Sequence, residues 1–125
     1  MESNTFFSHD TDEEIIQTKR LQEINIWVSH LSYVTNECDW LTKIASNKLG
    51  DKDLRDKLLE RNELNSALLN ELYNYKGSIG SFNECDDLEC DLFYINQHDI
   101  FCNKYVKHIE DYRVIKNQVY LKILE

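Results

Sequence analysis

Apolar residues recur every seven positions along most of the chain, which predicts helices packed side by side. The seam of the first segment comprises Ile24, Trp27, Leu31, Val34, Cys38, Leu41 and Ala45. The seam of the last segment comprises Leu88, Leu92, Ile95, His98, Cys102, Tyr105, Ile109 and Tyr112. The middle segment offers Leu54, Leu58, Leu68, Leu72 and Tyr75, interrupted by Arg61, Asn62 and Asn65. These seams predict a helical bundle of the coiled-coil kind.

Start and stop signals divide the chain into three helices. Thr11 and Glu14 have the spacing of a capping box, and Gly50-Asp51 supplies a C-terminal glycine followed by an N-cap acid. A turn-rich stretch at 77–81 ends in Ser81, which forms a second capping box with Glu84. We therefore expect helices at about 11–48, 52–77 and 83–123, with residues 1–10 as a frayed N-terminal segment.

The chain has 125 residues, no proline and three glycines, which favours few, long helices in a single domain spanning residues 1–125. Short connections force neighbouring helices to run antiparallel. The predicted fold class is all-α, an elongated antiparallel up-down-up three-helix bundle.

The formal net charge is −9, from 23 acidic against 14 basic residues. This sign disfavours nucleic acid and anionic membranes as partners, so we expect neither. The acidic first residues do not resemble an export signal, and the four cysteines form no CxxC pair. We expect a cytoplasmic protein with reduced thiols.

Two further rows of apolar residues fall outside the seams. Ile26, Tyr33 and Trp40 repeat every seven residues on the first helix. The row on the third helix comprises Phe93, Ile100, Val114 and Leu121, broken by Lys107. One interpretation is that bundle geometry turns these positions partly inward. The other, which we favour, is a contact surface for a homodimer or for another helical protein.

Counting outward from the turns predicts one polar layer in the middle of the bundle, which gathers Glu37, Cys38, Arg61, Asn62, Glu63, His98 and Cys102. The structural interpretation is a hydrogen-bonded core histidine with two inert thiols, and no cofactor. The alternative is a metal- or small-ligand-binding bundle with zinc held by His98, Cys102 and Cys38, aided by Glu37 or Glu63.

An up-down-up bundle also places the starts of the first and third helices at one end. Asp12, Glu13, Glu84, Asp86 and Asp87 would then form an acidic pole, which compensates helix dipoles or docks a basic protein. The chain carries no GxGxxG, P-loop or GxSxG pattern. The sequence therefore favours a non-enzymatic interaction or assembly module over an enzyme.

Overall fold

A computed structural model describes residues 8–79 and 88–125, and these residues form helices with short connections. Helix α2 spans Ser8–Lys43 and continues into a single π-helical turn, η1, at Ile44–Lys48. Helix α3 spans Lys52–Ser78 and helix α4 spans Leu88–Leu124. Within the described ranges there is no β-strand, so the predicted all-α bundle of three helices is confirmed.

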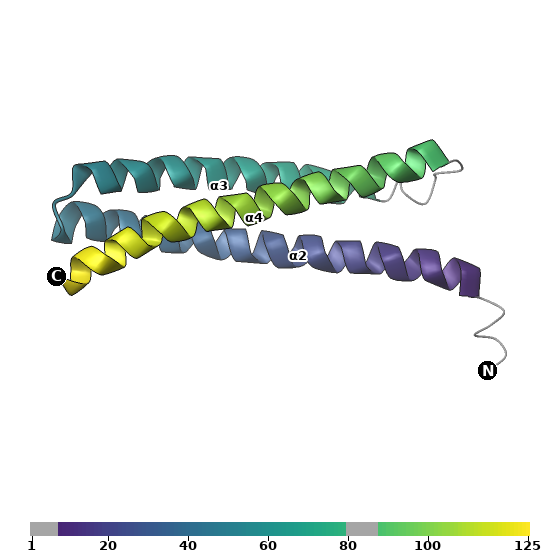
Figure 1. Ribbon diagram of the computed structural model, residues 1–125, viewed down its shortest axis with the longest axis horizontal. Coiled ribbons are helices and arrows are strands. Elements are labelled where there is room, and N and C mark those ends of the chain that lie inside the picture. The colour runs from purple at the N-terminus through teal and green to yellow at the C-terminus, as the bar shows by residue number, and fades with distance from the viewer. Residues whose placement is uncertain (1–7, 80–87) are drawn as a thin grey trace.

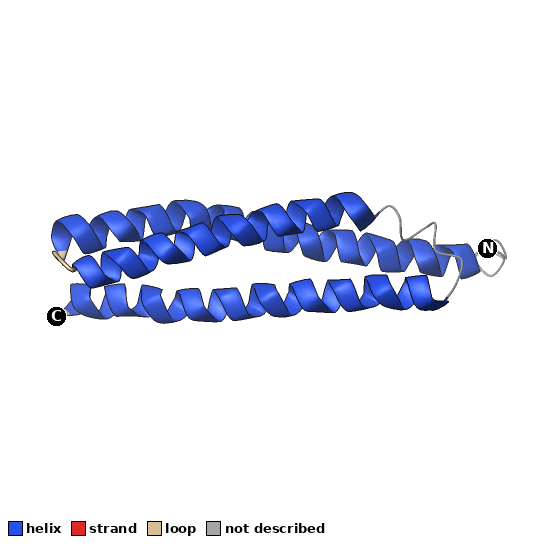
Figure 2. Cartoon of the chain, turned by 90° about the horizontal axis from the view of Figure 1, so that it is seen from above, coloured by secondary structure: helices blue, strands red, loops and turns tan. Residues whose placement is uncertain are grey.

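Hydrogen bonds between helices give their relative directions. Residues further along α2 pair with residues earlier in the chain around α3. The bonded pairs are Gln17 with Ile79, Leu31 with Asn65 and Cys38 with Leu58. From α2 to α4 both numbers rise together, as in the bond from Glu23 to His98 and that from Glu37 to Tyr112. Helix α3 therefore runs against α2 and α4, and the chain forms an elongated up-down-up rod (Figures 1 and 2).

The connection between η1 and α3 follows the predicted capping chemistry. Gly50 has φ +60°, a left-handed conformation that residues with a side chain rarely adopt. The Asp51 carboxylate accepts a hydrogen bond from the Leu54 backbone N–H at 3.0 Å and caps α3. The Asp51 N–H bonds the Ala45 carbonyl at 2.9 Å, which closes the end of η1.

The predicted N-terminal caps of the first and third helices are not seen among the residues that the structure describes. Helix α2 is described from Ser8, so the prediction that Thr11 caps it is wrong: Thr11 lies inside the helix, and 8–10 are helical. The predicted fraying of 1–10 stays a prediction. Ser81 and Glu84, the second predicted capping box, lie outside the described residues. Within the described part, α4 begins at Leu88.

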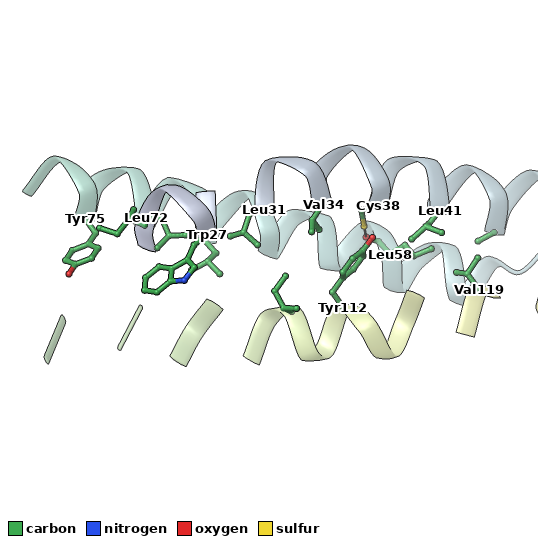
Figure 3. Close-up of a cluster of buried hydrophobic side chains, with 14 of the residues drawn as sticks. Trp27, Leu31, Val34, Cys38, Leu41, Leu58, Leu72, Tyr75, Tyr112 and Val119 are labelled. Atoms are coloured by element: carbon green, nitrogen blue, oxygen red, sulfur yellow. Dashed lines mark hydrogen bonds between the residues drawn. The ribbon is translucent and has the colours of Figure 1, made fainter. Parts of the chain in front are cut away.

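The core is one continuous row of buried side chains along the rod (Figure 3). Every predicted seam residue of the first segment is buried, from Ile24 in α2 to Ala45 in η1. On α4, however, Leu92 and Ile95 are 47% and 37% exposed, so their placement in the core was wrong. The reason is visible in Figure 1, where α4 diverges from α2 toward the end at which α4 begins.

No described helix carries an apolar stretch long enough to cross a membrane.

Candidate functional site

The outward row of α2 is exposed along its whole length. Ile26, Tyr33 and Trp40 are 63%, 53% and 53% exposed, and the rings of Tyr33 and Trp40 meet edge to face with centroids 6.3 Å apart. These two aromatic side chains leave apolar surface exposed to water, and a protein partner would cover that surface. The predicted outward orientation of this row agrees with the structure, and its role in contacts remains a prediction.

The first two residues of this row, Ile26 and Tyr33, lie in a stretch of α2 without charged residues, whereas Trp40 lies beyond it, next to Asp39. Between Ile24 and Asn36 the sequence has no Asp, Glu, Lys or Arg, although 30% of the chain is charged. The exposed polar residues of this stretch are Asn25, Ser29, Ser32 and Asn36. His30 is uncharged near neutral pH, since burial and then Arg113 lower its pKa. Short uncharged side chains let a second backbone approach closely, with little desolvation cost.

Contacts beneath the row join it to α4. Glu37 accepts a hydrogen bond from the Tyr112 hydroxyl at 2.6 Å and one from the Lys116 ammonium at 2.9 Å. The Tyr33 hydroxyl also bonds Glu37, and these hydrogen bonds together lower the pKa of the Glu37 carboxyl despite its partial burial, which acts in the opposite sense. Lys116 in turn lies over the exposed ring of Tyr120, 5.7 Å from its centroid. The carboxylate beside Tyr33 on α2 is therefore held in place by α4.

The outward row of α4 is exposed too. Phe93, Ile100, Val114 and Leu121 are all exposed, and Lys107, which interrupts them, is tied to Asp111 at 2.9 Å. Phe93 borders a groove of about 360 Å³ between α3 and α4. The groove's floor includes Phe101, whose ring stacks on Tyr75 with centroids 4.7 Å apart. Such an aromatic floor suits an apolar side chain of a partner.

Helix α4 is fastened to the other helices by polar side chains as well as by its apolar core residues. His98 Nε2 donates to the Glu23 carboxylate at 2.7 Å, because a carboxylate only accepts, and Nδ1 lies 2.7 Å from the Tyr75 hydroxyl. Burial raises the pKa of Tyr75 to about 12, so the hydroxyl keeps its proton and donates to the imidazole. The Tyr105 hydroxyl makes a similar contact with His30.

A second buried histidine, His108, is also held by polar contacts. Asn65 donates to the Leu31 carbonyl at 2.8 Å, so its oxygen is left to accept from His108 Nε2, also at 2.8 Å. His108 Nδ1 then faces the Arg61 guanidinium at 3.3 Å, and a guanidinium can only donate. Burial, and then the Arg61 charge, lower the pKa of His108 to about 4. The imidazole is neutral at pH 7 and serves as a structural hydrogen-bonding group.

The predicted polar layer is not assembled. Cys38 donates to the Leu58 carbonyl, whereas His98 lies beside Glu23. Glu23 and Cys38 are fifteen residues apart on one helix, which separates the predicted zinc ligands by roughly 22 Å. The prediction failed because the helices are paired differently: Cys38 faces Leu58 instead of residues 61–63, and Arg61 faces His108 instead of residues 98–102.

The remaining members of that layer are also separate. Glu63 is exposed, and Cys102 packs against the apolar core. Burial raises the pKa of Cys38 to about 11, which makes it an inert thiol. Across the residues that the structure describes, no three His, Cys, Asp or Glu side chains are placed to hold a metal ion. A zinc site at His98, Cys102 and Cys38 is therefore not supported by this geometry.

Two other expectations concern the cysteines and the acidic pole. Cys38 and Cys102 are free thiols, but Cys90 is disulfide-bonded, so the expectation of four reduced thiols was wrong. The acidic pole cannot be placed: Glu84, Asp86 and Asp87, and the side chains of Asp12 and Glu13, lie outside the described residues.

Sequence reasoning missed His108 and Asn65. The available signal was a third row on the last helix, in which Phe101, His108 and Ile115 are spaced by seven. All three are at least partly buried, because α4 lies against two helices and buries a face wider than a single seam.

No family model matches this chain, and comparison with curated proteins and with solved structures gave no match either.

Proposed function

We propose that this chain is a non-enzymatic assembly module that self-associates through the outward rows of α2 and α4. The observation that carries the proposal is the row of Ile26, Tyr33 and Trp40, which stays more than half exposed and whose first two residues lie in a stretch without charged residues. Aromatic and large aliphatic side chains with a polar rim are the usual composition of a protein contact. The exposed row of α4 provides a second surface of the same kind.

The buried contacts support a structural role for the polar groups. Each histidine that links α4 to its neighbours already has a hydrogen-bonding partner, as His98 has Glu23 and His108 has Asn65. Groups engaged in this way fix the pairing of helices. The rows on the outside are then the features that the fold itself does not use.

The proposal is tested by sedimentation velocity over a range of concentrations. Trp40→Ala and Ile100→Asp should each weaken self-association by roughly 10-fold, since contact energy concentrates in a few aromatic and large apolar residues. Helicity by far-UV circular dichroism should stay unchanged, because both side chains are exposed.

Tyr73→Ala is the matched control for this test. Tyr73 is 52% exposed on α3, like Tyr33, but belongs to neither row, so its loss should leave association unchanged. A strictly monomeric wild-type chain at high concentration would refute self-association. If the monomer bound only a different helical protein or a basic protein, the module would act on that partner instead.

A cytoplasmic location is part of the proposal. The free thiols of Cys38 and Cys102 support it, and the bonded Cys90 counts against it. Fluorescence microscopy of the tagged chain would decide, and localisation elsewhere would contradict it.

A further inference from the structure

The outward row of α2 extends one step further toward the start of the helix. Lys19 lies seven residues before Ile26 and is exposed, so the row reads Lys19, Ile26, Tyr33 and Trp40 at equal spacing. An evenly spaced row can pair with a copy of itself running in the opposite direction. With the crossing point beside Ser29, Ile26 then lies opposite Tyr33, and Lys19 lies opposite Trp40.

We propose that a second copy of this chain docks antiparallel on α2, with Ile26 against the partner's Tyr33 and Lys19 over the partner's Trp40. The inference rests on the proposed self-association and specifies the geometry of the contact that the row of α2 makes. At the centre of the contact, Ile26 and Tyr33 lie on either side of the short uncharged side chain of Ser29. At each end an ammonium group meets an indole ring, the aromatic side chain that attracts cations best.

Charge explains why the occupant is a second copy. Two molecules with a net charge of −9 repel each other, and the uncharged stretch between Ile24 and Asn36 is where they can approach without opposing carboxylates. Beyond this stretch, Asp39 lies next to Trp40 in the sequence, so in the antiparallel pair it comes close to the partner's Lys19. Both ends of the contact are therefore complementary in charge.

Charge also selects the direction. A parallel pair would bring Lys19 toward the partner's Lys19 and Asp39 toward the partner's Asp39, which is unfavourable at both ends. Asp39 has an exposed ion pair with Lys43 at 3.2 Å, one turn away on its own helix. That pair leaves Asp39 accessible, because its side chain is 57% exposed.

A charge-swap experiment on the full chain tests the geometry. Within one molecule Lys19 and Asp39 are twenty residues apart, roughly 30 Å along α2, so they cannot pair with each other. Lys19→Glu and Asp39→Lys should each weaken dimerisation by roughly 3- to 10-fold, measured by sedimentation velocity at low salt. The double variant restores opposite charges at both ends but not the contact of an ammonium group with Trp40, so it should dimerise more strongly than either single variant and less strongly than the wild type.

Mixing the two single variants gives an independent measurement. In an antiparallel pair of one Lys19→Glu chain and one Asp39→Lys chain, both ends again carry opposite charges. The mixture should therefore dimerise more strongly than either variant alone. General repulsion cannot produce the expected pattern, because Asp39→Lys lowers the negative net charge and would then strengthen association.

The outcomes separate this inference from the proposed function. A wild-type chain that stays monomeric refutes both. A wild-type chain that associates, while neither the double variant nor the mixture recovers, leaves self-association standing and overturns the antiparallel contact on α2. Recovery in both measurements, with unchanged helicity, supports the contact.

Discussion

At position 108 an imidazole lies between an amide oxygen on one side and a guanidinium group on the other. Asn65 accepts from Nε2, and Arg61 approaches Nδ1. A proton added to Nδ1 would point at the donor groups of Arg61 and would have to be buried with it. Among the neighbours of His108, only Asp111 favours that proton by its charge.

This arrangement predicts a specific loss of stability in acid. The pKa of His108 is lowered from its ordinary 6.5 to about 4, so between these values the unfolded chain binds a proton that the folded chain rejects. The contribution to stability is present above pH 6.5 and is lost as the pH falls toward 4. Urea unfolding should show it as a decrease of about 2 kcal/mol between pH 7 and pH 5.

His108→Gln is the control for this prediction. Glutamine can donate to Asn65 but does not titrate, so this variant should lack that 2 kcal/mol of the pH dependence. If wild type and variant lose the same stability between pH 7 and pH 5, His108 is not the titrating group.

Two neighbouring asparagines of α3 should respond very differently to the same substitution. Asn65 is fully buried and bonds Leu31, Thr35 and His108, whereas the Asn62 oxygen has no partner and its nitrogen makes one long bond of 3.5 Å. Asn65→Leu leaves His108 Nε2 unpaired and should lower the unfolding free energy by roughly 1–3 kcal/mol. Asn62→Leu should cost less than about 1 kcal/mol. Equal losses in thermal or urea unfolding would contradict this account.

At the scale of the helices, the sequence predicted what depends on nearby residues. Gly50 and Asp51 fix the break between η1 and α3 through one backbone angle and one cap, both of which involve only neighbouring positions. Pairing between helices depends on distant contacts instead. Counting from the turns placed His98 level with Cys38, but the bond from His98 to Tyr75 places it near the opposite end of the rod.

The candidate site likewise has a part that the sequence could predict and a part that it could not. The exposed rows could be predicted, since a spacing of seven on one helix decides which side chains share a face. The hydrogen bonds between helices could not be predicted. His108 and Asn65 are 43 residues apart in sequence, and they meet only when α3 and α4 are correctly aligned. The predicted alignment of Cys38 with Cys102 was wrong by about three turns, because bonded residues of α2 and α4 differ by 75 in number and Cys102 therefore lies level with Trp27.

The two described glycines should respond to alanine in opposite ways. Gly50 has a left-handed backbone, and a side chain there costs about 1 kcal/mol even though no atom lies within 4 Å of the added Cβ. Gly77 lies in α3 with equally open surroundings, so Gly77→Ala should stabilise by about 0.5–1 kcal/mol. Thermal denaturation of the two variants should shift in opposite directions. A stabilising Gly50→Ala would mean that the turn differs from the one described.

At the scale of the whole molecule, the rod has one apolar core to which all three helices contribute, and α4 is also attached through hydroxyl, imidazole and carboxylate groups. Tyr112 and Lys116 meet Glu37, and Lys122 meets Asp51 at 2.7 Å close to the end of α4. Polar attachments are directional, so they specify one alignment of α4. The apolar area that α4 and α2 do not bury against each other is left on the outside.

An odd number of long helices has a consequence for anything attached to the chain. Because the path crosses the rod three times, it enters at one end and leaves at the other (Figure 1). Fluorophores at Glu14 and Leu124 should be separated by a distance close to the length of α4, whose 37 residues span roughly 55 Å. Energy transfer between them would then be weak in the folded chain, and a fused domain at each end would be held apart as by a spacer.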